Sequence, residues 1–506
     1  MSNIRRQSII SSVVIYIGFA IGLLNIYLFT RQGLSADDHF TDAQFGLYNA
    51  FIAVATTMMA FANLAMPSYI YKFFLYYKDH LPPKKNDLIT WALVVSSIGY
   101  SLVIVAGIVF KDFVVRKYIE HSPEIVIYYN WVFILGYGLM IYTVLEAFAW
   151  QFHKSILTNF LREVQWRIFT TIFILLFLFG AIRDYGLFIK LFSFSYPAIA
   201  VILFLYLVFT KKIDFTFHVS KVTKRFFKSI LRLCSFVYVG SLIFTISLVF
   251  DSLVIGAVLN DALAKLAVYS LAQNIANIIQ APQRGIISAS IAHLSKAWKE
   301  KKMETLQRIY QRSSINQLVF SCGLYALITL NFIDAVNTFH LKESYLNGFY
   351  VFLLLGVTKV VDMGTGVNSQ IIGTSTYWRF EFISGIILLS VMLPLNYIFT
   401  KQYDIVGTAS AGLISITVYN LIRIIFLWKK FNLRPFTLQS LYTILFAGAC
   451  FGICYFLFQN MHGFAGLFLR SIVFCILYGT GAVYLKLSPD IIPVWNSFKK
   501  RIGLRV

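Results

Sequence analysis

The chain has 506 residues, of which 58% are hydrophobic and 13% charged, a composition that is typical of a polytopic membrane protein and excludes a soluble fold. Lysine and arginine number 44 against 22 acidic residues, which gives a formal net charge of +22. In a membrane protein this excess gathers in cytoplasmic loops facing anionic lipid, so the charge does not indicate nucleic acid as a partner.

Fourteen segments of the chain are apolar enough to cross a bilayer, which predicts an all-α polytopic membrane protein. The first of them ends at Thr30 and Arg31 without a small-residue cleavage site, so we interpret it as a retained first helix. The segments lie near residues 9–29, 44–71, 88–110, 125–150, 165–183, 187–210, 230–257, 266–292, 313–333, 345–372, 382–400, 405–428, 438–459 and 465–486.

The distribution of basic residues supports this count independently of hydropathy. With the N-terminus placed inside, 31 of the 44 lysines and arginines fall in inward segments, 9 in outward segments and 4 within spans. This split predicts that both termini are cytoplasmic. The inward segment from Lys296 to Arg312 predicts a basic amphipathic helix at the cytoplasmic surface.

The longest inward connection follows the sixth span and divides the membrane region into six, six and two helices. Such a linker often joins two homologous halves, and the motif A-x-[FL]-[GA]-[LV]-Y opens both the second and the eighth span. We therefore expect an N-terminal lobe over residues 1–210, a basic linker over 211–232, a C-terminal lobe over 233–428, and two further helices with a basic cytoplasmic tail over 429–506.

The eighth span carries polar residues where a lipid-facing helix would carry leucine and valine. Gln273, Asn277, Gln280 and Arg284 follow one another at spacings of four, three and four, so a continuous helix places them on one stripe. An arginine at membrane depth costs at least ~2.5 kcal/mol on insertion scales unless it faces a cavity, a counter-ion or a ligand. Arg284 therefore either contacts cargo, pairs with a carboxylate or snorkels towards the cytoplasm.

The tenth span has a second cation near its middle, Lys359, with Asp362 three residues later. Lys359 either contacts cargo or forms an internal ion pair with Asp362. Two buried cations in one half of a membrane protein indicate an anionic cargo. Polar residues nearby, among them Asn368, would offer hydrogen bonds to a sugar.

Three stretches resemble the polysaccharide flippases of the multidrug/oligosaccharidyl-lipid/polysaccharide exporter superfamily. One is the helix with Asp251 followed by AKLAVYSLAQNIANIIQAPQRGIISASIAHLSKAWKE, and the others are FGLYNAFIAVATTMMAFANLAMPSYIYKF and LPLNYIFTKQYDIVGTASAGLIS. The last of these has Thr400 and Asp404 where the family typically shows a proline and a glycine. Together with the six-six-two division, the resemblance covers nearly the whole chain.

The resemblance implies two six-helix lobes in a pseudo-symmetric, V-shaped arrangement plus two C-terminal helices. It also implies a flippase, not an enzyme, that moves undecaprenyl-pyrophosphate-linked oligosaccharide across the inner membrane for O-antigen, capsule or exopolysaccharide assembly. Partners would be membrane lipids and, as candidates, a polysaccharide polymerase and glycosyltransferases, with the chain acting as a monomer. No cofactor is expected, and Na⁺ or H⁺ is the candidate coupling ion.

Site residues follow from both lines of argument. The expected cavity residues are Arg284, Lys359, Gln273, Asn277, Gln280, Asp362, Asn368, Asn25 and Arg31. Asp251 and Asn396 match family positions that help bind a coupling cation, although a helix-end carboxylate explains Asp251 equally well. Glu146 and Arg423 are candidate partners across a cytoplasmic gate, or else interfacial anchors.

Three rival functions stay open. A lipid II flippase would also carry a polyprenyl pyrophosphate, and a multidrug antiporter would favour intramembrane carboxylates without compensating cations. A polyprenyl-dependent glycosyltransferase or polymerase would use acidic residues in the first outward loop, where Asp37, Asp38 and Asp42 lie. No nucleotide-binding motif or zinc ligand set occurs in the sequence, which argues against direct ATP hydrolysis.

Overall fold

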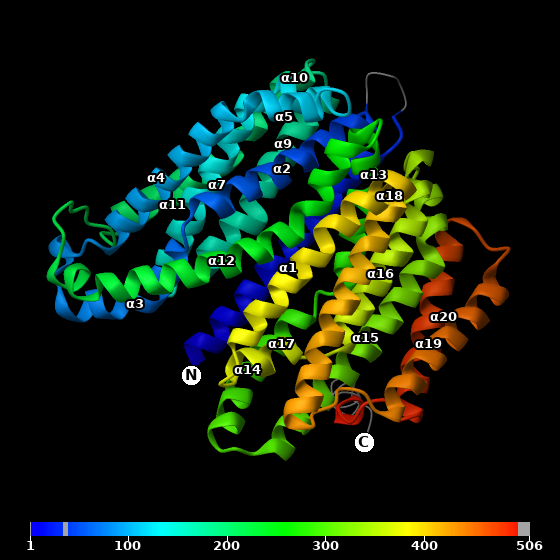
Figure 1. The fold of residues 1–506 in the computed structure, drawn as a ribbon. Helices are drawn as coiled ribbons and strands as arrows, with labels where there is room; N and C mark the ends of the chain where they lie inside the picture. Colours follow the sequence, from blue (N-terminus) through cyan, green and yellow to red (C-terminus); the bar gives the residue numbers. More distant parts are fainter. Residues whose placement is uncertain (1, 34–38, 494–506) are drawn as a thin grey trace. The chain divides into compact units, whose positions relative to one another are not determined.

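A computed structural model describes residues 2–33 and 39–493, and the regular structure of these residues is helical without a β-strand (Figure 1). The predicted all-α class is thereby confirmed. The chain divides into two compact units, residues 1–267 and 268–506. Most of the predicted basic tail, from residue 494 onward, lies outside the described residues.

The first unit is built around α7, which packs against α2, α3, α4 and α11. An aromatic cluster joins the end of α1 to the start of α2: the ring of Phe29 lies 4.6 Å from that of Phe40 and 5.1 Å from that of Phe45, centroid to centroid. Its elements are α1 (Ser2–Thr30), α2 (Asp42–Ala62), α3 (Met66–His80), η1 (Pro83–Lys85), α4 (Leu88–Val109), α5 (Lys111–Tyr118), α6 (Pro123–Ile127), α7 (Tyr129–Trp150), α8 (Ser155–Asn159), the π-helical turn η2 (Phe160–Gln165), α9 (Trp166–Leu178), α10 (Tyr185–Ser193), α11 (Ser195–Phe209) and α12 (Lys221–Val258).

Helix α12 begins inside the predicted linker and packs against α2 and α3 of the first unit. Ser220 caps it, and the buried carboxylate of Asp87 accepts hydrogen bonds from the Ser220 backbone N–H at 2.9 Å and the Thr223 hydroxyl at 2.7 Å. The predicted lobe boundaries and lobe arrangement stay predictions.

The second unit is built around α15, which contacts α14, α16, α19 and α20. Helix α13 (Ala262–Ile279) crosses from the first unit into the second. The remaining elements are α14 (Gln283–Lys299), α15 (Met303–Thr338), η3 (Glu343–Asn347), α16 (Gly348–Gly364), α17 (Asn368–Thr374), α18 (Arg379–Phe431), α19 (Leu438–Phe458) and α20 (Gly463–Tyr484).

Two predicted continuous helices are broken. The segment from 266 to 292 is interrupted between α13 and α14, because Pro282 has no N–H for a helical bond and the Gln280 and Gln283 amides bond three residues back. The single stripe from Gln273 to Arg284 is therefore wrong beyond Gln280. The amphipathic helix expected over 296–312 is also wrong as one element, because α14 ends at Lys299 and Lys301 takes a left-handed φ of 54° before α15 begins.

The tenth predicted span ends in a similar break, between α16 and α17. Gly366 has a φ of 69°, and a Cβ on it would lie 2.8 Å from the Ser313 hydroxyl and 2.9 Å from the Ser314 nitrogen. Only glycine combines that backbone conformation with so close an approach to α15. The two interruptions, at residues 280–282 and 365–367, both lie in the second unit.

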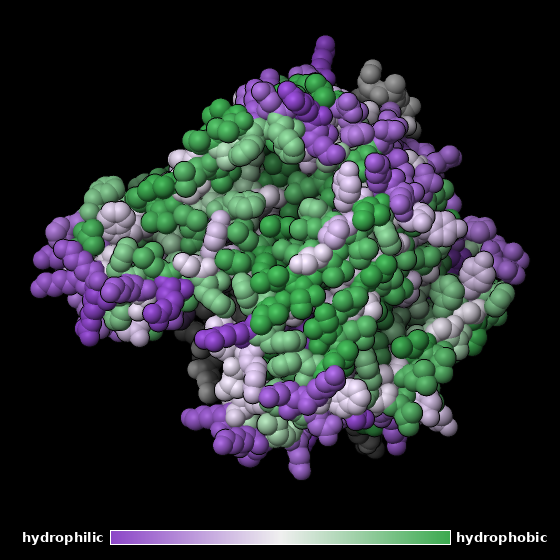
Figure 2. Space-filling view, in the orientation of Figure 1, coloured by the Kyte–Doolittle hydropathy of each residue, from purple (hydrophilic) through white to green (hydrophobic). Residues whose placement is uncertain are grey.

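Twelve helices of the described residues are long and apolar enough to cross a membrane. The count of fourteen stays a prediction. Helix α18 contains two of the predicted spans, separated by non-helical backbone at Tyr403 and Asp404. Helix α9, which corresponds to the predicted span over 165–183, has 13 residues and is too short to cross a bilayer by itself. In Figure 2 hydrophobic residues cover the middle of the helices and hydrophilic residues gather at their ends, as expected for a multi-pass membrane protein.

Candidate functional site

The two broken helices of the second unit bring polar side chains together at their interruptions. Gln280 and Gln283 flank the turn between α13 and α14, and Asp362, Thr365 and Asn368 flank the turn between α16 and α17. Irregular backbone at membrane depth is tolerated where it is buried in protein or lines a water-filled cavity, and discontinuous helices of this kind form substrate and ion sites in transporters. This cluster is therefore the candidate site.

Asp362 is the acceptor at the centre of the cluster. Its Oδ2 accepts from Gln280 Nε2 at 3.0 Å and from Gln283 Nε2 at 3.2 Å, and its Oδ1 accepts from Asn420 Nδ2 at 3.2 Å. Three amide groups thus share the carboxylate, two from the break between α13 and α14 and one from α18. Amide donors satisfy the oxygens of Asp362 without neutralising its charge.

Gln280 connects this carboxylate to the cation predicted from sequence. Lys359 Nζ donates to Gln280 Oε1 at 2.9 Å, while Gln280 Nε2 donates to Asp362. The sequence left open a direct pair between Lys359 and Asp362. The hydrogen bonds of the described residues run instead through the Gln280 amide, so one side chain at the α13–α14 break positions both charged groups.

A second set of hydrogen bonds connects Asn420 of α18 to the turn between α16 and α17. Asn420, which is fully buried in α18, accepts at Oδ1 from the Thr365 hydroxyl at 3.0 Å and from Asn368 Nδ2 at 2.8 Å. Asn368 was expected at the site. Asn420, Thr365 and Gln283 were not, and the one sequence signal for Asn420 is its position three residues before Arg423, on the same face of a helix.

Arg423 lies in the same unit beyond these hydrogen bonds. Its guanidinium pairs with Glu381, donates to the Tyr419 hydroxyl and stacks over the Tyr419 ring at 3.6 Å. Glu381 also accepts from the Ser369 hydroxyl at 2.7 Å. These contacts join α17 to both ends of α18, across the turn at Tyr403 and Asp404.

The other gate candidate, Glu146, belongs to the first unit. It is buried in α7 and pairs with Arg162 at 3.0 Å on the π-helical turn η2. Each gate candidate therefore has an ion-pair partner within its own unit. Whether the two residues act at a gate stays a prediction.

The remaining cavity candidates have more varied surroundings. Gln273 is half-buried and Asn277 exposed on α13. Arg284 lies in the first turn of α14, and its side chain is outside the described part of the structure. Asn25 is buried in α1 of the first unit, where it donates to the Arg167 carbonyl at 3.0 Å and accepts from the Thr171 hydroxyl at 2.6 Å. Half-buried Arg31 directly follows α1.

The coupling candidates are buried, one in each unit. Asp251 lies in α12 and Asn396 in α18. Asn396 Oδ1 accepts from the Thr400 hydroxyl at 3.2 Å, and that hydroxyl lies 2.8 Å from the one of Thr408. An amide oxygen and two hydroxyls are ligands suited to a hard cation. Among the described residues, no group of three or more His, Cys, Asp and Glu side chains is placed to hold a metal.

The chain belongs to the family described as polysaccharide biosynthesis protein, whose model matches residues 4–298, more than half of its length. The family predicted from sequence is thus confirmed. No curated protein matches the chain in sequence.

Solved structures share its fold at low sequence identity. A lipid II flippase MurJ in an inward closed conformation aligns with a TM-score of 0.71 and 14% identity, covering 94% of this chain and 99% of that one. An inward-facing multidrug resistance MATE family transporter of the MOP superfamily aligns with a TM-score of 0.61 and 16% identity, covering 83% and 94%. A MOP superfamily transporter from Pyrococcus furiosus gives 0.51 and 16%, covering 88% and 95%.

These structures are a flippase and transporters, and the comparisons support the prediction that the chain is not an enzyme. Of the acidic residues considered for the rival enzyme, Asp42 lies in the first turn of α2. Asp37 and Asp38 lie outside the described residues.

Proposed function

We propose that the chain is a flippase that moves undecaprenyl-pyrophosphate-linked oligosaccharide from the cytoplasmic to the periplasmic leaflet of a bacterial inner membrane by alternating access. Membership of the polysaccharide biosynthesis family and the fold shared with a lipid II flippase support this function. The observation that carries it is the Lys359–Gln280–Asp362 network at the interruptions of two membrane helices.

The network suits an anionic headgroup that arrives and leaves. A pyrophosphate is bound by charge-assisted hydrogen bonds from cationic side chains. Lys359 supplies one such group, and Arg284 in the first turn of α14 is the proposed second. Lys359 donates to the Gln280 amide oxygen and can exchange that bond for one to a phosphate oxygen, so the ammonium need not be desolvated without a partner.

For the rest of the cycle we assign the roles expected from sequence. Asp251 and Asn396 are the candidates for Na⁺ or H⁺ coupling, and the Thr400 and Thr408 hydroxyls beside Asn396 favour a cation at that position. Both termini would be cytoplasmic. Glycosyltransferases would act before translocation, and a polymerase would act after it.

A second candidate function is lipid II translocation. The solved structure with a TM-score of 0.71 is a lipid II flippase. Lipid II, like the proposed cargo, is a polyprenyl pyrophosphate. The Lys359 network would serve either headgroup, so the sugar distinguishes the two functions.

Proteoliposomes containing the purified chain test the proposal. They are loaded with a fluorescent polyprenyl-pyrophosphate oligosaccharide or with lipid II, and leaflet exchange is followed with and without a Na⁺ or proton gradient. We expect exchange of the oligosaccharide lipid with an unchanged sugar chain, abolished by Lys359→Ala and retained by Lys429→Ala, an exposed lysine at the end of α18. Elongation or transfer of the sugar would establish an enzyme instead, and exchange of lipid II alone would establish the second candidate.

A further inference from the structure

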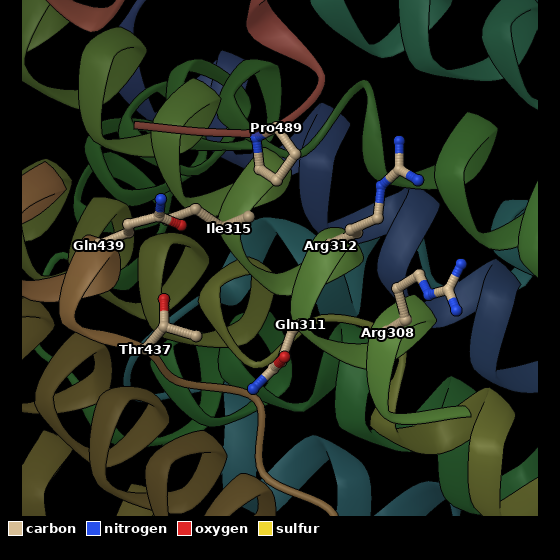
Figure 3. Close-up of a pocket in the computed structure, with 7 residues that line it drawn as sticks. All are labelled: Arg308, Gln311, Arg312, Ile315, Thr437, Gln439 and Pro489. Atoms are coloured by element: carbon tan, nitrogen blue, oxygen red, sulfur yellow. The ribbon is translucent and has the colours of Figure 1, made fainter. Parts of the chain in front are cut away.

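The second unit contains a cavity of about 360 Å³ that none of the roles above uses. It lies where α15 begins, beside the start of α19 and the segment that follows α20 (Figure 3). Its lining residues are Arg308, Gln311, Arg312, Ile315, Thr437, Gln439 and Pro489. Five of the seven are polar or cationic residues, and none is acidic.

Two arginines give the cavity its charge. Arg308 and Arg312 are four residues apart on α15, and their guanidinium groups extend from the same side of that helix (Figure 3). Arg312 is held by Asp490, which also accepts from Asn316 Nδ2 at 2.6 Å. Arg308 is exposed and makes no hydrogen bond or ion pair within the described part of the chain, and neither does the side chain of Gln311.

The Asp490 carboxylate beside the cavity is thus already bonded to Arg312. Glu304, four residues before Arg308 on α15, does not line the cavity, so the lining itself carries two guanidinium groups and no carboxylate. The start of α19 adds to this positive charge, because the first turn of this 21-residue helix contains no acidic residue. Thr437 and Ser440 form a capping box there, and the remaining N–H groups of the first turn have no helical acceptor. An anion placed here would meet Arg308 and the positive end of α19.

The surface next to the cavity is apolar. Leu438, Leu441 and Leu445 occupy the first two turns of α19 and are 72%, 53% and 61% exposed, and Phe436 just before them is 50% exposed. An isolated phosphate would leave these side chains uncovered. A phospholipid would place its phosphate between Arg308 and the start of α19 and its acyl chains along the exposed leucines.

We infer that this cavity binds a phosphate group, and specifically the phosphodiester of an anionic phospholipid, with Arg308 and Gln311 as its principal donors. This lipid is distinct from the transported one and its binding does not depend on the proposed function. Its site lies at the basic end of α15, where the positive-inside distribution predicts the leaflet that is rich in anionic lipid.

Binding is measured on the full chain in detergent, by native mass spectrometry and by thermal unfolding with added phosphatidylglycerol, phosphatidylcholine or inorganic phosphate. We expect phosphatidylglycerol to bind and to raise the unfolding temperature more than either other ligand. Arg308→Gln should weaken phosphatidylglycerol binding about tenfold, the loss expected for one charge-assisted hydrogen bond. Arg308→Lys should restore part of it, because the charge returns without the forked donor geometry.

Lys299→Gln is the matched control, since it removes an exposed charge at the end of α14 without touching the cavity. Equal phosphatidylglycerol binding by the wild type and Arg308→Gln would overturn the site. Equal losses in Arg308→Gln and Lys299→Gln would overturn it as well, because they would indicate attraction to the whole basic surface. Protection by inorganic phosphate that depends on Arg308, without a lipid effect, would overturn the lipid assignment.

Discussion

Replacing Asn420 by alanine should loosen the second unit through the polar cluster. Asn420 makes three hydrogen bonds to other segments, with Asp362, Thr365 and Asn368. If each contributes the average of interhelical hydrogen bonds in membrane proteins, about 0.6 kcal/mol, the loss is about 2 kcal/mol. Asp362 keeps its bonds to Gln280 and Gln283, and Thr365 keeps its bond to the Asp362 carbonyl at 2.8 Å, so the Asn368 amide is the donor left unsatisfied. One unsatisfied buried donor costs about 1–3 kcal/mol, which raises the expected loss to about 3–5 kcal/mol.

The assay is reversible chemical unfolding of the purified chain in detergent, with Ser410→Ala as the control. The Ser410 hydroxyl donates only to the Val406 carbonyl of its own helix at 2.8 Å, so its loss should change the free energy of unfolding by less than about 0.5 kcal/mol. A double-mutant cycle with Thr365→Val should give a coupling energy of about 0.5–2 kcal/mol. Equal stability of Asn420→Ala and the control, with no coupling to Thr365, would refute the network as a unit.

Three further predictions concern other positions. Asp404→Gly should raise the free energy of unfolding by up to about 2 kcal/mol in chemical unfolding, because Asp404 has φ 59° and ψ −151°, a conformation that only glycine adopts without strain. The loss of the hydrogen bond that Asp404 Oδ1 accepts from the Ile405 N–H at 2.7 Å offsets part of this gain. Gly366→Ala should lower that free energy by ~1–3 kcal/mol, since its φ is 69° and the new Cβ would meet the Ser313 hydroxyl; an unchanged value would show that α15 moves aside. Arg312 and Asn316 hold the pKa of the Asp490 carboxyl below its usual range, so the stability it contributes is present above about pH 4 and is lost as the pH falls through the lowered pKa. The hydrogen-exchange protection of residues 485–493, taken relative to the intrinsic exchange rate at each pH, should therefore fall at low pH in the wild type, whereas Asp490→Asn should be weakly protected throughout.

Hydropathy and charge determined the class of this protein and much of its chain organisation. Long apolar segments have few stable alternatives to membrane helices, because backbone groups in lipid must bond internally. The same reasoning pointed to the two segments that carry the candidate site, since Gln280 and Arg284 in one and Lys359 in the other are costly to expose to lipid. The mismatch at Asp404 was also visible in the sequence, and its non-helical backbone lies at the turn within α18.

Only the tertiary structure decided which polar groups meet. A spacing of four, three and four residues predicts a stripe, but the break at Pro282 ends that register and turns Gln280 and Gln283 towards Asp362. Asn420 reaches the same carboxylate from 58 residues away, and Asn25 is bonded to Arg167 and Thr171 within the first unit. Helical periodicity fixes neighbours within one segment, whereas contacts between segments depend on helix packing and on where each helix is interrupted.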